Sequence, residues 1–480
     1  MLDKKSITHT GRLCFAHIPA RYVSILMISL GIFLDYSYKS FLGVTIVAMV
    51  RHDSKSKTMN TECPVDDIQN GANSSSSFGE FEWTDSQQTV ILGAFYYGYI
   101  FTNFPAGIIY EKLSGKWLVG CSVLTTGILS AIGPIVMRLG GNSIVPIVLI
   151  RIGQGFSEGI MFPIINAMIA KWMPKIERSR AVSLTFVGSS LGVVVSLSLS
   201  GYLCSTTIMG GWPAIYYFLG IGSFIWFIFW SLFVFDSPDT HPYISQNEYN
   251  YIKSGQGYET NGSKKHIPWK SMLTSYRVYS AVITHFGANW GYFTLLTLLP
   301  TYYDKILHMN IKSDGFISSL PYIANAIVSF SVSYITDKLR QKGFNITVLR
   351  KINNSIAFFG TGFYVIFFII GLGLNGCIYS GVFATYVDMS PNYAGFLMGF
   401  SNTFATIPCI ISPLIASQIY KNGQSLKTWS YVFYICFGIY FCTQIIYILF
   451  ASSELQSWGM TTKTKTKKPN NVDHITNTKL

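Results

Sequence analysis

The chain has 480 residues, of which 50% are hydrophobic and 12% are charged, whereas about 25% are charged in an average soluble domain. The formal net charge is +13, but the basic residues lie mostly in short segments between long apolar blocks. That arrangement indicates the sidedness of a membrane protein and does not predict a nucleic-acid partner. The chain contains no phosphate-binding loop and no metal-spaced cluster, so it predicts neither ATP-driven pumping nor a metal cofactor.

Apolar blocks long enough to cross a bilayer, about 20 residues each, follow one another along the chain. We therefore predict an all-α integral membrane protein with a cytosolic N-terminal tail over residues 1–20 and a first half over 21–235. The spans expected in this half are 21–50, 89–110, 117–137, 144–169, 181–203 and 212–235. The polar segment 51–84 is expected to be an external loop, and Asn73 in it begins an Asn-Ser-Ser glycosylation sequon.

A hydrophilic segment, 236–275, divides the chain and is expected to be a cytosolic linker. The second half is expected over 276–450, with a cytosolic tail at 451–480. Its clear spans are 278–302, 316–335, 394–420 and 429–450.

The apolar run 356–386 is long for one span and short for two. The loop 336–351 and the C-terminal tail are both basic, so an even number of helices should separate them. We predict two short spans here that turn near residues 371–373, which gives twelve spans. One long helix, which gives eleven, is the alternative.

An internal repeat supports a design of two halves. Glu111-Lys112-Leu113 ends the second span, and Asp337-Lys338-Leu339 stands at the same register of the eighth. Two six-span halves joined by a linker are typical of transporters whose site lies between the halves near mid-membrane.

Two charges, Arg151 and Glu158, lie inside the span 144–169. A charged side chain at bilayer depth costs at least about 2.5–3.5 kcal/mol, so it usually faces protein or water. Seven residues are about two helical turns, so both should face the same way. Arg151 offers a fork for a carboxylate or phosphate, and Glu158 is a candidate proton carrier. A structural Arg–Glu pair that locks the helix is the alternative.

Three other spans carry polar candidates. Lys39 lies in the first span, four residues after Asp35, so the two either pair with each other or leave Lys39 as a cation facing a cavity. His285 and Asn289 share a face of the seventh span, and Asn402 lies in the eleventh. We predict Lys39, Asn289 and Asn402 as substrate contacts and His285 as a proton site; a purely structural role for the histidine is the alternative.

An enzyme is the least favoured class. Residues 155–159, GFSEG, match the G-x-S-x-G pattern, but that motif needs a strand-to-helix turn, and here it lies in a membrane helix.

Motifs along most of the chain resemble one family. IPARY, GVTIVAMV, ILGAFYYGYI, SGKWLVG, RIGQGFSEGIMFP, KWMPKIERSR, DSPDTHPYIS, TLLTLLPTYY and GFISSLPY, with NTFATIP after YAGFLMG, occur in the order found in the anion:cation symporters of the major facilitator superfamily. This group contains sialin, the vesicular glutamate and nucleotide transporters and the type I sodium–phosphate cotransporters, and TLLTLLPTYY is most similar to sialin.

The resemblance implies transport of organic anions or phosphate. By position, Arg151 and Glu158 match residues that the family links to substrate binding and proton coupling. Lys39 stands where an arginine is usual, Asn166 and Tyr386 stand where histidines are usual, and Ala288 replaces an arginine of the glutamate carriers.

We therefore predict a monomeric secondary transporter of a small organic anion, such as a sialic acid or another acidic sugar, coupled to protons and working without a cofactor. A sodium-dependent phosphate or urate carrier and a non-transporting paralogue are the alternatives. Endolysosomal or vesicular membranes and the plasma membrane are both compatible with the sequence.

Overall fold

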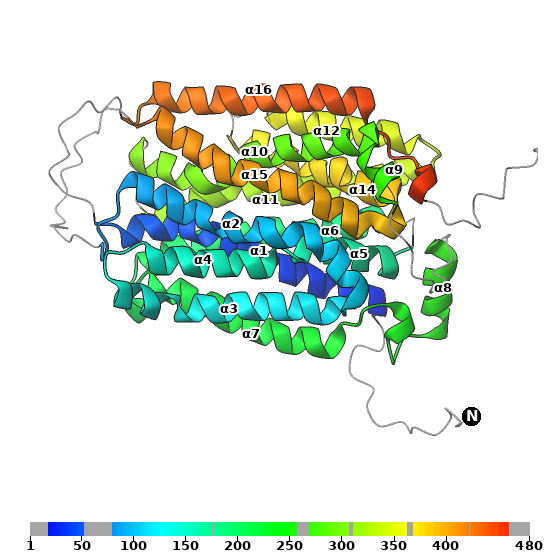
Figure 1. The fold of residues 1–480 in the computed structure, drawn as a ribbon, viewed down its shortest axis with the longest axis horizontal. Coiled ribbons are helices and arrows are strands. Elements are labelled where there is room, and N and C mark those ends of the chain that lie inside the picture. Colours follow the sequence, from blue (N-terminus) through cyan, green and yellow to red (C-terminus); the bar gives the residue numbers. More distant parts are fainter. Residues whose placement is uncertain are drawn as a thin grey trace, which may run out of the picture.

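The computed structural model describes residues 18–51, 79–174, 177–256, 268–306, 311–361, 368–421 and 423–459. These residues form long helices that run side by side along the longest axis of the molecule (Figure 1). The short helix α8 (Gln246–Gln256) lies across one end, here called the linker end. The opposite end, here called the loop end, carries Arg51 and Glu80, which flank the undescribed part of the predicted external loop.

Six crossings form the first half. They are α1 (Ala20–Met49), α2 (Asp85–Lys112), α3 (Gly115–Gly140), α4 (Val145–Glu158) continued by α5 (Met161–Trp172), α6 (Arg178–Cys204) and α7 (Pro213–Phe233). The fourth crossing is broken at Gly159 and Ile160. A Cβ on Gly159 would lie 2.4 Å from the carbonyl oxygen of Tyr99, so the close approach of α2 requires glycine there.

The linker carries η3 (Pro238–Thr240), α8 and α9 (Trp269–Leu273). Glu248 of α8 accepts hydrogen bonds from the backbone nitrogens of Ala20 and Arg21 at 3.0 and 3.1 Å. A carboxylate at the start of α1 satisfies amide groups that have no partner inside the helix, so the linker is fixed against the first half.

Six crossings also form the second half. They are α10 (Tyr276–Lys305), α11 (Ile311–Gln341), α12 (Ile346–Thr361), α13 (Phe368–Asn375) continued by η4 (Gly376–Ser380) and α14 (Val382–Met389), α15 (Ala394–Ile419) and α16 (Leu426–Phe450). The short helices η2 (Ile208–Gly210), η5 (Pro391–Tyr393) and η6 (Ser457–Gly459) lie outside these crossings.

The apolar run 356–386 belongs to two antiparallel crossings. Arg350 of α12 contacts Ser380 of the following segment, and Gly360 of α12 contacts Leu374. The turn predicted near 371–373 is wrong, since these residues lie inside α13, and the connection falls in the undescribed residues 362–367. The crossing also starts earlier than predicted, at Ile346. Arg350 lies buried in its first turns, with Nη2 2.9 Å from Oδ2 of Asp388. A hydropathy profile scores such a residue as polar and therefore places it outside the span.

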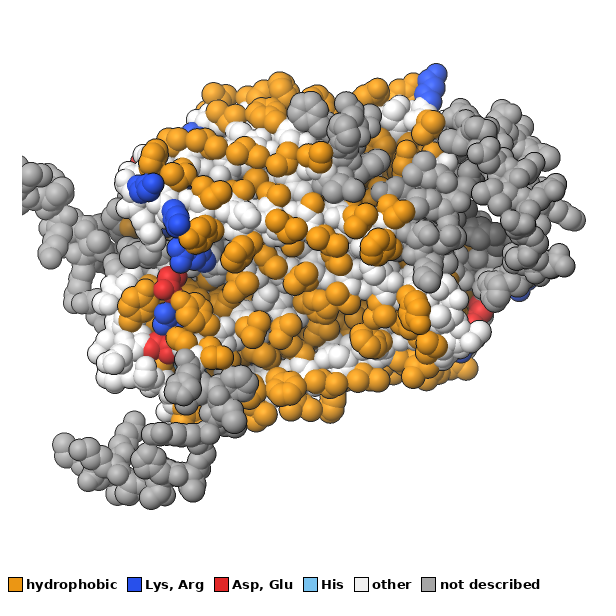
Figure 2. All heavy atoms as spheres, turned by 180° about the vertical axis from the view of Figure 1, so that it is seen from behind, with side chains coloured by type: hydrophobic (Ala, Val, Ile, Leu, Met, Phe, Trp, Pro, Cys, Tyr) orange, Lys and Arg blue, Asp and Glu red, His pale blue; other side chains and the backbone are white. Residues whose placement is uncertain are grey.

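Among the described residues, nine helical segments are long and apolar enough to cross a membrane. Hydrophobic side chains cover the middle of the face seen in Figure 2, and charged side chains gather toward the ends. The predicted all-α membrane fold is therefore confirmed. Between the halves, α6 packs along α11 and α2 packs along α15.

Candidate functional site

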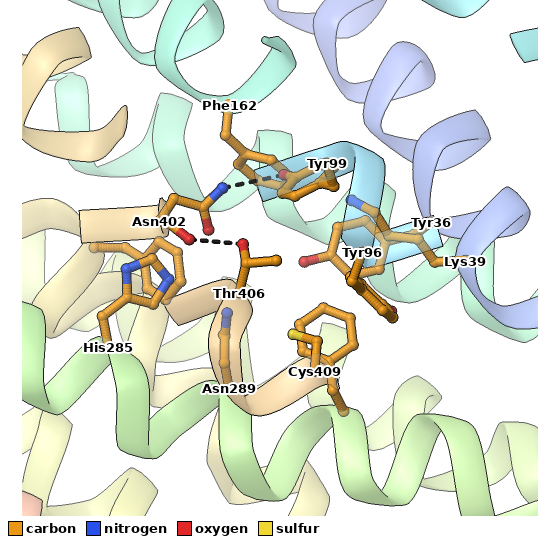
Figure 3. A pocket seen from close by; sticks show the side chains of 12 residues that line it. Tyr36, Lys39, Tyr96, Tyr99, Phe162, His285, Asn289, Asn402, Thr406 and Cys409 are labelled. Atoms are coloured by element: carbon orange, nitrogen blue, oxygen red, sulfur yellow. Dashed lines mark hydrogen bonds between the residues drawn. The ribbon is translucent and has the colours of Figure 1, made fainter. Parts of the chain in front are cut away.

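A small cavity lies between the two halves. Its walls come from α1, α2 and α5 in the first half and from α10, α14 and α15 in the second (Figure 3). The lining residues are Tyr36, Lys39, Tyr96, Tyr99, Phe162, His285, Asn289, Phe293, Phe383, Asn402, Thr406 and Cys409. A mid-depth cavity lined by both halves can pass a solute when the halves rock.

Lys39 is the cation in the described lining of this cavity. Its Nζ atom is 2.7 Å from Oδ2 of Asp35, so the i, i+4 pair considered for the sequence does form. Aromatic rings surround the ammonium group, with the ring centres of Tyr99, Tyr36 and Phe162 at 4.6, 4.9 and 5.1 Å. Rings at these distances stabilise a cation without neutralising it, and Asp35 supplies the negative charge.

Arg151 lies outside the lining of the cavity and is 2% exposed. Its Nη1 atom donates to the carbonyl oxygen of Tyr38 at 2.7 Å and to Oε1 of Gln154 at 3.1 Å, which ties α4 to α1. Its guanidinium carbon lies 5.0 Å from the ring centre of Phe95, a ring that Lys39 also approaches, at 5.6 Å. In this conformation a solute in the cavity therefore meets Lys39 and not Arg151.

Glu158 also lies outside the lining and is fully buried. Within the described part of the chain, neither of its carboxyl oxygens has a hydrogen-bond partner. Asp35, Lys39 and Arg151 act electrostatically on it. Glu158 thus lies near the Lys39–Asp35 pair without lining the cavity.

Asn289 and Asn402 both line the cavity. Asn289 donates from Nδ2 to the carbonyl oxygen of Ala405 at 2.8 Å. Asn402 reaches across the interface, where Nδ2 donates to the hydroxyl of Tyr99 at 3.1 Å and to Oδ1 of Asn103 at 2.8 Å. The bond to Tyr99 is drawn in Figure 3. Asn402 therefore links α15 to α2 as well as facing the cavity.

His285 lies on the second-half wall of the cavity. Its Nδ1 atom is 2.9 Å from the Ser401 hydroxyl, which is 2.5 Å from the Tyr386 hydroxyl. Tyr386 in turn donates to the carbonyl oxygen of Ala281 at 3.0 Å. This chain holds the imidazole ring in place and leads away from the cavity.

The structure brings Lys39, His285, Asn289 and Asn402 together, and Asn73 lies outside the described residues. Sequence reasoning missed the hydroxyl groups and the thiol of the lining, carried by Tyr36, Tyr96, Tyr99, Thr406 and Cys409. A signal was present for the tyrosines, because Tyr96 and Tyr99 are three residues apart, as are Tyr36 and Lys39, and such pairs share a helix face.

The halves are in close contact toward the linker end. A Cβ on Gly395 would lie 2.8 Å from the carbonyl oxygen of Pro163, and one on Gly399 would lie 2.7 Å from that of Asn103. The Ser183 and Ser333 hydroxyls of α6 and α11 are hydrogen-bonded to each other. This packing separates the cavity from the linker end.

Two helical halves around a mid-depth polar cavity define a multi-pass membrane transporter. The Major Facilitator Superfamily profile matches residues 28–413, and the chain belongs to this superfamily. It is 34% identical to human Sialin, over 92% of this chain and 91% of that protein. It is 35% identical to a Putative inorganic phosphate cotransporter of Drosophila ananassae, over 90% of this chain and 92% of that protein.

The chain is also 30% identical to human Vesicular glutamate transporter 2, over 95% of this chain and 78% of that protein. These relatives confirm the resemblance seen in the motifs. Among solved structures, a bacterial homolog to the human lysosomal transporter Spinster, in an inward-facing and occupied conformation, superposes with a TM-score of 0.58 at 10% identity. That match covers 90% of this chain and 97% of the bacterial chain, and it supports the fold.

Proposed function

We propose that this protein is a secondary active transporter that moves a small organic anion through the central cavity by alternating access, coupled to protons. The observation that carries the proposal is the ammonium group of Lys39 in the wall of a mid-depth cavity shared by both halves. A buried cation in the wall of a cavity shared by both halves favours a negatively charged solute.

The chemistry of the lining favours a hydroxylated monocarboxylate such as an acidic sugar. Beside Lys39 stand the amides of Asn289 and Asn402 and the hydroxyl of Thr406, which suit sugar hydroxyl groups. Among the described lining residues one cation is present, and Asp35 already balances it. A divalent phosphate would leave a larger uncompensated charge at this depth.

Proton coupling fits the acids near Lys39. Asp35 and Glu158 are both fully buried, and Glu158 has no hydrogen-bond partner among the described side chains. An unpaired buried carboxylate is costly, and protonation removes that cost. These acids are therefore the groups that we assign to proton exchange.

A sodium-coupled phosphate or urate-type carrier is the second candidate. The similarity to proteins named putative inorganic phosphate cotransporters favours it. Dependence on external sodium separates the two, because a proton-coupled carrier keeps its uptake when sodium is replaced.

The test is uptake of radiolabelled sialic acid, glucuronate, glutamate, phosphate and urate into proteoliposomes, with and without a proton or a sodium gradient. We expect proton-driven uptake of an acidic sugar and its loss in Lys39→Ala. Lys112→Ala, at the linker end of α2, is the matched control and should keep full uptake. If no anion on this panel moves under either gradient, the chain is a non-transporting paralogue and the proposal fails.

A further inference from the structure

The ion pair between Lys39 and Asp35 raises a difficulty for anion binding. The pair is 2.7 Å long, and the side chains are 2% and 0% exposed. A cation already held by an internal carboxylate has little attraction left for a second anion. The incoming anion must therefore compete with Asp35 for the ammonium group.

Asp35 is placed to be released. Its Oδ2 atom contacts Lys39, whereas no described group hydrogen-bonds its Oδ1 atom. Lys39 lines the cavity and Asp35 does not, so a solute reaches the ammonium group first from the cavity side. Asp35 also acts electrostatically on Glu158, which lies outside the cavity lining as well.

Among the described groups around Asp35, Glu158 is the other acid, and Lys39 and Arg151 are the strong bases. The ionisable groups around Asp35 are Lys39 and Tyr36 on α1, Tyr96 and Tyr99 on α2, Arg151 and Glu158 on α4, and Cys409 on α15. Helices α6 and α7 face α1 with Ser196, Ser223 and Trp226. Helices α10 and α11 bring the rings of Tyr292 and Tyr322, and His285 lies across the cavity.

The buried charges of the first half sum to zero when all are ionised. Lys39 and Arg151 contribute two positive charges, and Asp35 and Glu158 contribute two negative charges. A bound monovalent anion changes this sum to minus one. One added proton restores neutrality, and the carboxylate that has just lost its cation is where that proton is most needed.

We propose that Asp35 is the internal competitor of the transported anion and the site that takes up the coupled proton. The inference rests on the proposed function. The anion replaces Asp35 at the Lys39 ammonium group, and the freed Asp35 carboxylate gains one proton from the compartment that supplies the anion. The protonated Asp35 donates to the Glu158 carboxylate beside it. After the halves rock, the anion and the proton leave together and the pair between Asp35 and Lys39 forms again. The cycle carries one proton per monovalent anion and no net charge.

The main test is Asp35→Asn in proteoliposomes, using the anion that the wild-type protein transports. The amide cannot hold the negative charge, so Lys39 is always available. We expect the anion to bind about tenfold more tightly at pH 7.5, because the competent state no longer needs protonation. Binding should lose its pH dependence between pH 5.5 and 7.5. Anion exchange without a gradient should persist, while proton-driven accumulation should be lost.

Two further variants make the result specific. Asp35→Glu keeps an acid at the site and should restore proton-driven accumulation with a shifted pH profile; it carries the test if the amide variant does not fold. Asp85→Asn, at the exposed start of α2, should behave as the wild-type protein. If the wild-type protein transports the anion, either of two results would overturn this inference alone. One is proton-driven accumulation with an unchanged pH profile in Asp35→Asn. The other is an unchanged pH profile of accumulation in Asp35→Glu. Absence of any transport by the wild-type protein would overturn the proposed function itself.

Discussion

At the scale of the residue, polar side chains inside apolar spans were a reliable guide to the cavity. Lys39, His285, Asn289 and Asn402 come from three separate spans, and all four line it. The rule works because burying an unpartnered polar group in lipid is costly, so such groups face the protein interior or a cavity. The rule does not distinguish a side chain that is buried in the protein interior from one that faces a cavity. Arg151 satisfies the same rule by binding the Tyr38 carbonyl oxygen behind Phe95.

The position of Arg151 leads to a prediction about its role. Its contact with the Tyr38 carbonyl oxygen is made one residue before Lys39, so it fixes the part of α1 that presents the ammonium group. We expect Arg151→Ala to abolish uptake under a pH gradient, because a charge-assisted hydrogen bond of about 1.5–3 kcal/mol is lost and Glu158 loses a buried counter-charge. Arg151→Lys should recover part of the uptake. Wild-type uptake by a folded Arg151→Ala protein would remove this role.

At the scale of the element, hydropathy predicted the long helices and failed where polar residues are buried inside one. Helix α12 starts at Ile346, within the segment that its charges suggested was a loop. Arg350 is 1% exposed there because it donates to Asp388 and to the Ser380 carbonyl oxygen. A sequence shows the charge of such a residue but not the partner that neutralises it, and this partner is 38 residues away along the chain.

The packing of α15 on the first half can be tested through Gly399. A Cβ there would lie 2.7 Å from the Asn103 carbonyl oxygen and 3.3 Å from the Pro163 side chain. We expect Gly399→Leu to force the halves apart at the linker end and to lower uptake at least about tenfold, because backbone atoms cannot yield as side chains do. Gly438→Leu on α16 is the matched control, since a Cβ there meets no described atom within 4 Å.

Cys409 lines the cavity, so its reactivity shows whether Gly399→Leu opens the cavity toward the linker end. A membrane-impermeant thiol reagent applied from the linker end should modify Cys409 faster in Gly399→Leu than in the wild-type protein, as measured on the Cys409 peptide by mass spectrometry. Equal modification rates together with normal uptake would show that the contact does not separate the cavity from that end.

At the scale of the whole molecule, Glu80 joins the loop ends of three segments. Arg138 donates to its two carboxyl oxygens at 3.0 and 2.8 Å, and Trp212 donates to Oε1 at 3.1 Å. The hydrogen bonds from Arg138 are the main cause that lowers the pKa of Glu80 below its ordinary value of 4.5. A carboxyl group with a lowered pKa stabilises the fold above its ordinary pKa and loses that effect as the pH falls through the folded value.

We therefore expect this contact to persist at pH 5 and to be lost only below about pH 4.5. Glu80→Gln should lower the melting temperature at pH 7 by about 1 °C, a small effect because the pair is half exposed and the chain is long. The difference from the wild-type protein should shrink as the pH is lowered below 4.5. Glu82→Gln is the matched control, because the Glu82 side chain is 61% exposed, against 39% for Glu80, and its contact with Arg51 should contribute little. A melting difference that grows on acidification would contradict this account.

The orientation of the molecule is the last property that its charges predict. Basic residues concentrate at the linker end, where they are Arg21, Lys112, Lys116, Lys171, Arg180, Lys253, Lys270, Arg277, Lys338, Arg340, Lys342, Arg350 and Lys351. An excess of Lys and Arg marks the cytosolic side, so the loop end should face the lumen or the outside. Asn73 is then available to the glycosylation machinery, whereas the sequon Asn345-Ile346-Thr347, whose asparagine directly precedes α12 at the linker end, is not.

We expect the protein expressed in a eukaryotic cell to show a glycosidase-sensitive shift in electrophoretic mobility. Asn73→Gln should abolish the shift, and Asn345→Gln should leave it unchanged. Asn73 and Asn345 belong to opposite ends of the same bundle, and the sequon Asn261-Gly262-Ser263 lies in the linker. A shift that persists in Asn73→Gln would contradict this orientation. The tight packing of α15 on α2 and α5 would then lie on the external side.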